Sequence, residues 1–432
     1  MPRPTELRPA GSPRARAAVE TPTTPTPASN VVATGAAAPP VRADDGVRPI
    51  PPATANRPDE MMLMQYNVEN LFDTVDDPKK QDEDFTPQGR ERWTDEKLSF
   101  KLQNMGRVVR GVNGGRGPDI LALQEVENKQ VLDQLNRGAL RGLGYREPIL
   151  LEGQDARGID VALITRYPLA GQPKIHDISD PSWRGPSRPV LEVPLDVDGR
   201  EVTVFVNHWP SKGGGAQAEV ERAAAGDRLR QLVSDKLRRD PDAEVLAVGD
   251  FNSDLGEAPL RDHLRAAADP TEAARSSAEA PVLYDAMYDA AQHGAGHQGN
   301  ITSDAPPLRS GDLKAEISAR RAVLATATRP APSGNPDEAG KVGTHYYKKD
   351  NSWSTLDHVV MSRGLLDAKG LSYVPGSAQV VHDDDIENRD GSPKRFMPPP
   401  RRGDQERGLP PPQVLGYSDH FPVVARFKRQ RD

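Results

Sequence analysis

The stretch MMLMQYNVENLFD, residues 61–73, begins with an apolar run that is typical of a buried strand. The run breaks at Asn67, and Glu69 follows two residues later. In an extended chain, residues two apart point to the same side. We therefore expect an amide oxygen and a carboxylate to leave the end of this strand together, where both could bind one ligand.

Six more short apolar runs follow, and their length and Val/Ile/Leu content predict strands of a covered sheet. They are DILALQE (119–125), IDVALITR (159–166), VTVFVNHW (202–209), EVLAVGDFN (244–252), LDHVVMS (356–362) and FPVVARF (421–427). Longer amphipathic segments at 94–112 and 216–239 predict helices. Strands and helices alternate irregularly, which indicates a layered α/β domain rather than a helix bundle or an all-β barrel.

Six of these seven runs carry polar residues at one end, after the apolar residues in four runs and before them in two. If the sheets are mixed, carboxyl ends of some strands meet amino ends of antiparallel neighbours at one edge, where layered α/β proteins commonly bind ligands. We therefore predict a single site there. Its carboxylates are Glu69, Glu125, Asp250, Asp357 and Asp419, its amides are Asn67, Asn207 and Asn252, and its imidazoles are His208 and His420.

Each of these motifs alone has a simpler structural explanation. Asn67 suits a turn, GDFN (249–252) suits a Gly-Asp turn, and SDH (418–420) suits a loop that leads into a helix cap. Six such coincidences at six strand ends favour a shared site instead. Oxygen donors with few histidines and no cysteine favour Mg²⁺, Mn²⁺ or Ca²⁺ over zinc.

The chain of 432 residues has a net charge of −7 and contains no cysteine. The charge argues against non-specific nucleic-acid binding through an excess of Lys and Arg, but it leaves a local basic groove possible. A metal ion would then supply positive charge for an anionic substrate. The absence of cysteine excludes disulfides, thiolate zinc sites and a cysteine nucleophile.

No apolar run is long enough for a transmembrane helix, so we expect no membrane span. We also find no apolar core of a signal peptide near the N-terminus, and the localisation stays open. Residues 1–60 are rich in Pro, Ala and Thr, as expected of a disordered tail. Residues 61–430 form the expected folded domain, with long loops near 302–340 and 376–413.

Taken together, NVENLFD, LQE, NHWPSK, GDFN, LDH and SDH occur in the order typical of the endonuclease/exonuclease/phosphatase superfamily, which this chain resembles from about residue 62 to 427. The resemblance implies the DNase-I-like fold, a four-layer α/β sandwich in which two packed mixed β-sheets are flanked by helices. It also implies metal-dependent phosphoester hydrolysis by in-line attack of water. NVENLFD and NHWPSKGGG are similar to bacterial nuclease-like members, so we expect a nuclease that acts on DNA or RNA.

The resemblance further implies a role for each residue of the predicted site. The metal positions are Asn67, Glu69, Glu125 and Asp419, and the catalytic positions are His208, Asp250, Asn252, Asp357 and His420. His208 would stabilise or protonate the leaving oxygen. Asp250 and Asn252 would orient or activate the attacking water. Asp357 would fix the tautomer of His420 and raise its basicity.

Several alternatives stay open at this point. Either Asp250 or His420 could be the general base, and the carboxylates permit one metal ion or two. Lys212 in NHWPSKGGG is a candidate phosphate contact because the glycines let the backbone come close, but an ordinary solvated lysine explains it equally well. The Pro-, Gly- and charge-rich loops argue against a phospholipid or sphingomyelin phosphodiesterase. The filled site positions argue against an inactive binding module. We expect a monomer without a stable protein partner.

Overall fold

The computed structural model describes residues 59–178, 187–294, 343–383, 385–396 and 416–429. The expected loop at 302–340 lies outside these segments, as do residues 1–58 of the expected tail and the part of the 376–413 loop that follows residue 396. The domain bounds at 61 and 430 therefore stay a prediction. None of the helices in the described segments has the length and apolar character needed to cross a bilayer.

The first sheet contains the opening stretch of the sequence as its interior strand β1 (Glu60–Leu71). β1 pairs in parallel with β2 (Ile120–Val126) and antiparallel with β16 (Val423–Arg429). The sheet is completed by β4 (Asp160–Thr165), β3 (Ile149–Leu150), β14 (Leu371–Tyr373) and β15 (Gln379–Val380). This sheet is mixed, as the sequence predicts.

The second sheet is also mixed. In spatial order its strands are β5 (Lys174–His176), β6 (Val190–Val197), β7 (Arg200–His208), β8 (Glu244–Asp250), β13 (Asp357–Met361), β10 (Leu283–Asp285) and β9 (Ala266–Ala267). β7 and β8 are parallel, whereas β13 runs antiparallel to β8. A separate hairpin consists of β11 (His345–Tyr347) and β12 (Ser352–Ser354).

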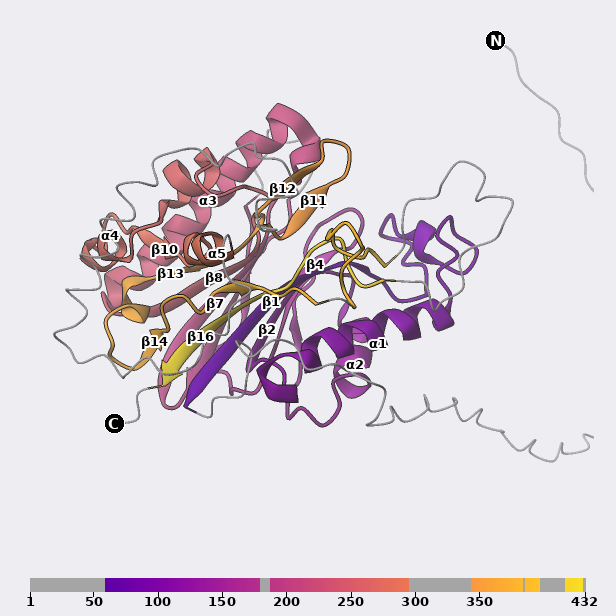
Figure 1. Cartoon of the computed structure of the whole chain (residues 1–432), viewed down its shortest axis with the longest axis horizontal. Coiled ribbons are helices and arrows are strands. Elements are labelled where there is room, and N and C mark those ends of the chain that lie inside the picture. The colour runs from indigo at the N-terminus through magenta and orange to yellow at the C-terminus, as the bar shows by residue number, and fades with distance from the viewer. Residues whose placement is uncertain (1–58, 179–186, 295–342, 384, 397–415, 430–432) are drawn as a thin grey trace, which may run out of the picture. The chain divides into compact units, whose positions relative to one another are not determined.

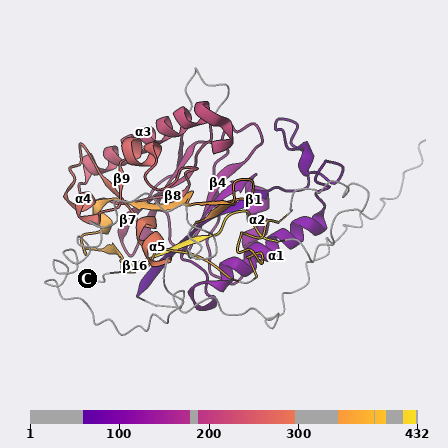
Figure 2. The ribbon, with the colours of Figure 1, turned by 45° about the horizontal axis from the view of Figure 1, so that its top comes forward.

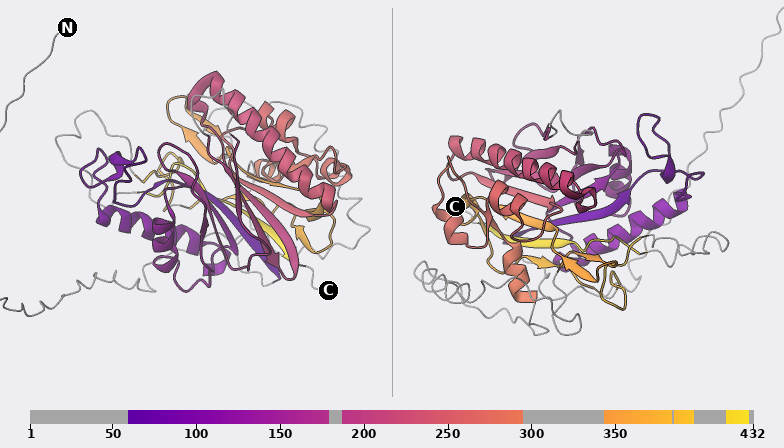
Figure 3. Two further views of the ribbon diagram at one scale, coloured as in Figure 1. Left: turned by 180° about the vertical axis from the view of Figure 1, so that it is seen from behind. Right: turned by 90° about the horizontal axis from the view of Figure 1, so that it is seen from above.

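Helices cover the outer faces of the two sheets (Figure 1). α1 (Asp95–Gly111) and α2 (Lys129–Arg137) pack on the first sheet, and α3 (Gly215–Arg239) packs on the second. In the views of Figures 2 and 3, α4 (Pro270–Arg275) lies beside β9 and β10 of the second sheet, whereas α5 (Met287–Gly294) lies beside β15 at the margin of the first. Short helical turns occur at residues 83–85, 113–115, 212–214, 259–264 and 363–365. The four layers are those of the DNase-I-like sandwich.

Burial on both faces explains why β1 reads as a continuous apolar run. Met61 and Leu63 face the core between the two sheets, where they join a cluster that includes Val204 of β7. Met62 and Met64 face the opposite side and pack in the cluster that contains Val108 of α1. The predicted strand is therefore stabilised by apolar side chains that are buried on both of its faces.

Helix α1 also ties the end of β1 to the rest of the domain. The helix begins where the Thr94 hydroxyl accepts a hydrogen bond from the backbone N of Lys97. Two turns later, the fully buried Lys101 donates from Nζ to the backbone O of Glu69 and of Tyr417, both at 2.9 Å. One ammonium group thus holds the polar end of β1 beside the segment that leads into β16.

The strand ends that carry the polar motifs meet at one edge, as expected for mixed sheets. Asp357 at the start of β13 is the register partner of Asp250 at the end of β8, and His208 at the end of β7 is the partner of Asp250 on its other side. In the first sheet, Asn67 lies opposite Gln124, the residue before Glu125. The structure thus brings the ends of β7, β8 and β13 side by side, and the ends of β1 and β2 likewise.

Candidate active site

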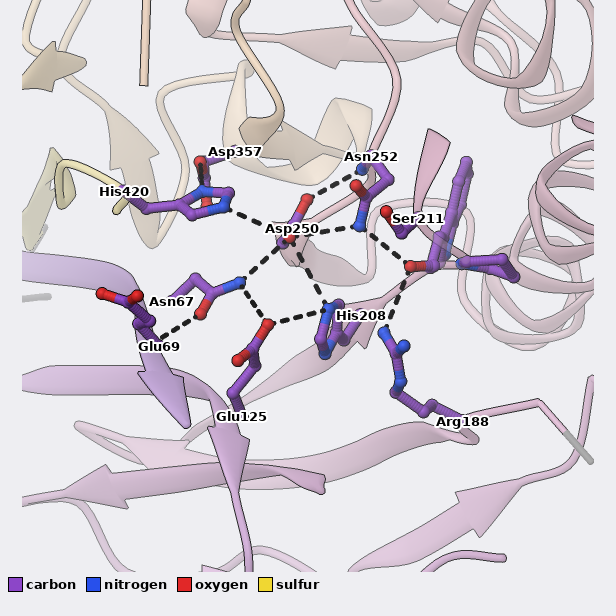
Figure 4. Close-up of polar contacts among 12 residues, drawn as sticks. Asn67, Glu69, Glu125, Arg188, His208, Ser211, Asp250, Asn252, Asp357 and His420 are labelled. Carbon is purple, nitrogen blue, oxygen red and sulfur yellow. Dashed lines mark hydrogen bonds and ion pairs between the residues drawn. The ribbon is translucent and has the colours of Figure 1, made fainter. Parts of the chain in front are cut away.

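Asp250 lies at the centre of a group of polar side chains (Figure 4). Its Oδ2 accepts hydrogen bonds from Nδ2 of Asn67 at 3.1 Å and from Nδ2 of Asn252 at 3.2 Å. Its Oδ1 accepts from the backbone N of Asn252 at 2.8 Å. Burial raises the pKa of the Asp250 carboxyl to about 7, although nearby His420 opposes the shift. This carboxyl can therefore exchange a proton near neutral pH.

Asn67 links Asp250 to the first sheet. The same Nδ2 that donates to Asp250 also lies 3.4 Å from Oε1 of Glu125. The other oxygen of Glu125, Oε2, accepts a hydrogen bond from the backbone N of Asn70 at 2.9 Å. Two residues that are 183 positions apart in the chain, Asn67 and Asp250, are thus in direct contact.

His420 forms a buried pair with Asp357, and the two groups lie 2.7 Å apart between Nδ1 and Oδ2. Nε2 of His420 points toward Asp250, with 3.9 Å to Oδ2 (Figure 4). Burial alone would lower the pKa of His420, but Asp357 raises it well above its usual range. Burial would likewise raise the pKa of Asp357, but His420 holds it below the usual value. The pair is therefore an imidazolium and a carboxylate at neutral pH.

His208 approaches Asp250 from another side. Its Nε2 lies 3.6 Å from Oδ2 of Asp250 and 3.8 Å from Oε1 of Glu125. Burial lowers the pKa of His208 well below its usual range, with a smaller contribution from Arg188 and His420. The two histidines at this site thus differ in charge, because His208 is neutral where His420 is protonated.

Asn207, the third amide of the predicted set, supports the strands rather than the polar group. Its Nδ2 donates to the backbone O of Phe205 and of Val248, and its Oδ1 accepts from the indole N of Trp209. Between β7 and β8 the approach is so close that a Cβ on Gly249 would lie 2.0 Å from the backbone O of Asn207. Glycine is therefore required immediately before Asp250.

The expectation that Asn67 and Glu69 point the same way is wrong. Glu69 and Asn70 have positive φ angles of 50° and 58°, so the backbone is not extended there and the alternation of strand side chains does not apply. The backbone N of Glu69 instead donates to Oδ1 of Asn67 at 3.0 Å, which closes a tight turn. Figure 4 shows Glu69 directed away from Asp250.

The Glu69 carboxylate contacts Arg395, a residue that belongs to none of the sequence motifs. Nε of Arg395 donates to Oε1 of Glu69 at 2.6 Å, and the backbone N of Phe396 donates to Oε2 at 3.2 Å. The same guanidinium lies 3.2 Å from Oδ2 of Asp419. Burial raises the pKa of Glu69 to about 7, with a further contribution from Asp419, whereas Arg395 opposes the shift. Two predicted metal ligands thus share one cationic side chain.

Lys212, the candidate phosphate contact, is engaged with carboxylates. Its Nζ lies 2.8 Å from Oε1 of Glu257 and 3.2 Å from Oδ2 of Asp254. These partners compete for the charge that a phosphate group would use. Contact between Lys212 and a phosphate stays a prediction.

Gln65 and Ser418 also support the site, although neither is among the predicted site residues. Nε2 of Gln65 donates to Oδ1 of Asp357 at 2.6 Å. The Ser418 hydroxyl donates to the backbone O of Asn67 at 2.7 Å and accepts from the backbone N of His420 at 3.1 Å. Ser418 is in the SDH motif and Gln65 lies two residues before Asn67 on the same face of β1, so both could have been suspected. Arg395 carries no such signal.

The donors suit a hard divalent cation in their chemistry, because Glu69, Glu125 and Asp419 supply carboxylate oxygens and Asn67 supplies an amide oxygen. Across the described parts of the chain, however, no three His, Asp or Glu side chains are grouped as ligands around one point. Glu125 with Asn67 is the part of the set that Arg395 does not contact. A metal ion here would use few protein ligands.

A protein-family profile and several solved structures match this chain. The profile of the Endonuclease/Exonuclease/phosphatase family matches residues 62–300 and 335–429. No curated protein matches the sequence. The chain is similar to the solved structure of truncated TDP2 from Caenorhabditis elegans, with 15% identity and a TM-score of 0.43, over 85% of this chain and 97% of that one.

Two further solved structures have a similar sequence identity and TM-score. A mannosyl-6-phosphatase from Bacteroides thetaiotaomicron has 14% identity and a TM-score of 0.45, with 85% of this chain and 99% of that chain covered. The human Nocturnin catalytic domain with a bound sulfate anion has 16% identity and a TM-score of 0.43, with 87% and 96% covered. The family profile spans most of the chain and includes every predicted site position. The chain belongs to the Endonuclease/Exonuclease/phosphatase family and is a phosphoester hydrolase.

Proposed function

We propose that this hydrolase is a divalent-metal-dependent phosphodiesterase that cleaves nucleic acid by direct attack of water. The observation that carries the proposal is the position of Asp250, whose Oδ2 lies within reach of two amide donors and two imidazoles. A buried carboxyl with a pKa of about 7 is suited to accept a proton from water at neutral pH.

Asp250 is the better candidate for the general base. Asn67 and Asn252 hold its carboxylate through their amide groups, so its orientation toward an attacking water would be fixed. His420 already holds a proton because of Asp357 and cannot accept another. The imidazolium of His420 would instead donate from Nε2 to a phosphate oxygen and stabilise the negative charge that develops there.

His208 would act at the leaving oxygen. It is neutral, so one ring nitrogen can carry a proton while the other accepts one. Its Nε2 lies beside both Glu125 and Asp250, at 3.8 and 3.6 Å. A hydrogen bond from this nitrogen to the departing oxygen would lower the cost of breaking the phosphoester bond.

Glu125 would hold the metal ion, and Asn67, whose Nδ2 lies beside Glu125, would become a further ligand only if its amide turned to present Oδ1. The bound ion would neutralise a non-bridging phosphate oxygen and the charge that develops on the leaving group. Mg²⁺ commonly binds through one or two carboxylates and completes its shell with water and substrate phosphates. That preference suits a site without a preformed cage of protein ligands and favours Mg²⁺ or Mn²⁺ over Ca²⁺.

The surroundings of the site favour a polyanion over a lipid. Arg157 and Arg188 are close enough to His208 to lower its pKa. The large apolar side chains that are exposed in the described segments are Val75, Leu151, Leu169, Ile175 and Val220. None is aromatic, whereas helices that lie in a membrane surface usually present Trp or Phe side chains. These features support nucleic acid as the substrate class.

An activity panel tests the proposal. Plasmid DNA, single-stranded RNA, a short-chain phospholipid and a phosphomonoester would each be incubated with the protein and Mg²⁺ or Mn²⁺. We expect cleavage of DNA or RNA that stops when the metal is chelated. The Glu125→Ala variant should lose this activity, because it removes the carboxylate assigned to the ion.

The other outcomes of the panel are equally informative. Turnover of the phospholipid alone would replace nucleic acid with a lipid substrate. Full activity of Glu125→Ala would refute the metal assignment. Absence of turnover on every phosphoester would favour a binding module of the same fold.

A further inference from the structure

Arg395 forms the shortest charged contacts of the site, and neither the motifs nor the proposed reaction uses it. Its Nε and Nη2 lie 2.6 and 2.5 Å from Oε1 of Glu69, and Nη2 lies 3.2 Å from Oδ2 of Asp419. Such charge-assisted contacts from a planar guanidinium are among the strongest hydrogen bonds in proteins. One positive side chain therefore joins two carboxylates that would otherwise repel each other.

The backbone around Arg395 is held on both sides, so the contact is part of the fold. The backbone N of Lys394 donates to the O of Ile386 at 2.8 Å, and the N of Tyr417 donates to the O of Lys394 at 2.6 Å. Next to Arg395, the Phe396 ring packs edge-on against Trp93, with 5.5 Å between centroids. Arg395 is thus fixed between the segment before β16 and an aromatic cluster.

The Glu69 carboxylate has little room for another partner. Only 7% of its side chain is exposed, Arg395 contacts Oε1, and the backbone N of Phe396 donates to Oε2. A hydrated cation would have to break these contacts and lose its own water. Glu125 is different, because no Arg or Lys contact to its carboxylate is found among the described residues and 17% of its side chain is exposed.

We propose that the guanidinium of Arg395 takes the place of a second cation at Glu69 and Asp419, so that the enzyme binds one divalent ion, at Glu125. This inference rests on the metal-dependent function proposed above and narrows it from one or two ions to one. The guanidinium carries a fixed positive charge, because arginine does not lose its proton in proteins. Removal of Arg395 frees two adjacent carboxylates, which are the ligands that a hard cation prefers.

Binding stoichiometry tests the inference without any activity measurement. The full-length protein would be stripped with a chelator and titrated with Mn²⁺ in a calorimeter, and free Mn²⁺ would be followed by electron paramagnetic resonance. We expect one ion per wild-type chain and two per Arg395→Ala chain. The Arg395→Lys variant, which keeps a cation, should bind one. The double variant Arg395→Ala/Glu69→Gln should also return to one.

The chain offers a closely matched control. Arg200 contacts the buried Glu244 at 2.7 Å, with side-chain exposures of 47% and 2%, against 45% and 7% for Arg395 and Glu69. Arg200→Ala also frees a buried carboxylate, but it lies at the opposite end of β7 from the site, so it should still bind one ion. Circular dichroism would establish that each variant is folded.

The possible failures are distinguishable. A wild-type chain that binds no Mn²⁺ would refute the proposed metal dependence itself. A wild-type chain that binds two ions would overturn the role of Arg395 and leave the proposed function standing, and this arm needs no variant to fold. One ion in folded Arg395→Ala would show that the freed carboxylates form no cation site, which also overturns the inference.

Discussion

Two histidine–aspartate pairs lie on opposite faces of one strand. Asp357 and His358 are neighbours in β13, and because strand side chains alternate, each faces a different layer. Asp357 pairs with His420 and His358 pairs with Asp285, both at 2.7 Å between Nδ1 and Oδ2. The protein thus contains the same ionic contact twice, a few ångströms of backbone apart.

The two pairs differ in the contacts of Nε2, the histidine nitrogen that does not face the aspartate. Nε2 of His358 donates to the backbone O of Ser253 at 2.9 Å and of Thr355 at 3.0 Å, so the ring has no unused donor. For Nε2 of His420, no hydrogen bond is found among the described residues, and Oδ2 of Asp250, at 3.9 Å, is too far away to form one. An imidazole with one nitrogen that makes no hydrogen bond can act on a substrate. An imidazole with both nitrogens hydrogen-bonded to the protein can only stabilise the fold.

The first prediction separates the pairs by activity. In His420→Asn the amide can still donate to Asp357, but Nε2 is lost. Activity should fall by about 10²–10⁴-fold, which is the usual contribution of a group that transfers or donates a proton. His358→Asn should change kcat by less than about tenfold. Steady-state hydrolysis of the best substrate from the panel provides the measurement. Equal losses of activity in the two variants would show that Nε2 of His420 has no special part in the reaction.

The second prediction separates them by stability. His358→Asn removes the cation from a fully buried pair and leaves Asp285 and two carbonyl groups without their partner. Breaking a buried pair in this way costs about 3–5 kcal/mol. Urea unfolding should show this loss, with a smaller loss for His420→Asn because its site is polar. The interpretation is wrong if His420→Asn proves the less stable variant.

The third prediction concerns pH. Burial would lower the pKa of His358, but Asp285 raises it to about 9, whereas the ring in an unfolded chain titrates near 6.5. The folded state therefore holds the proton more tightly. The resulting stability is fully present below pH ~6.5 and is lost as pH rises through about 9, for a total on the order of 3 kcal/mol.

The control for this pH effect is the difference between wild type and His358→Asn. Other groups titrate in the same range, including Glu127, whose pKa burial raises to about 8. Their contributions cancel in the difference, which should shrink from pH 6.5 to pH 9. Parallel stability curves across this range would mean that His358 is not charged in the folded protein.

The sequence predicts where most residues of these two pairs lie, because side chains at strand ends follow the simple alternation of a strand. The motifs that end in Asp250 and begin with Asp357 are placed side by side by the mixed sheet, and the inward direction of His358 follows from alternation. The helices at 94–112 and 216–239 are likewise found, as α1 and α3, because their apolar faces repeat at helical spacing.

What the sequence does not predict depends on backbone turns and on distant contacts. The direction of Glu69 is missed because a positive φ at a non-glycine residue leaves no mark in the pattern. Arg395 reaches Glu69 across 326 positions of chain, from a segment without regular structure. Asp285 is missed as the partner of His358 because β10 is only three residues long and its neighbour is set by the sheet order.

The last prediction uses the second oxygen of each aspartate. Oδ1 of Asp285 accepts from the backbone N of Met287, which substitution does not remove, whereas Oδ1 of Asp357 accepts from the side chain of Gln65 at 2.6 Å. Gln65→Met keeps the size of the side chain and deletes this donor to a charged group, which is worth about 1.5–3 kcal/mol. With Asp357 held less firmly, His420 should lose part of its orientation, and we expect kcat to fall by about tenfold while KM changes little.

Gln65→Glu adds a second carboxylate beside Asp357 and should lower kcat more than Gln65→Met does, because like charges repel in a buried site. If both variants keep the wild-type kcat, Asp357 does not need Gln65 to hold His420. The Asp357–His420 pair would then depend on no neighbouring side chain for its orientation, as the Asp285–His358 pair does not.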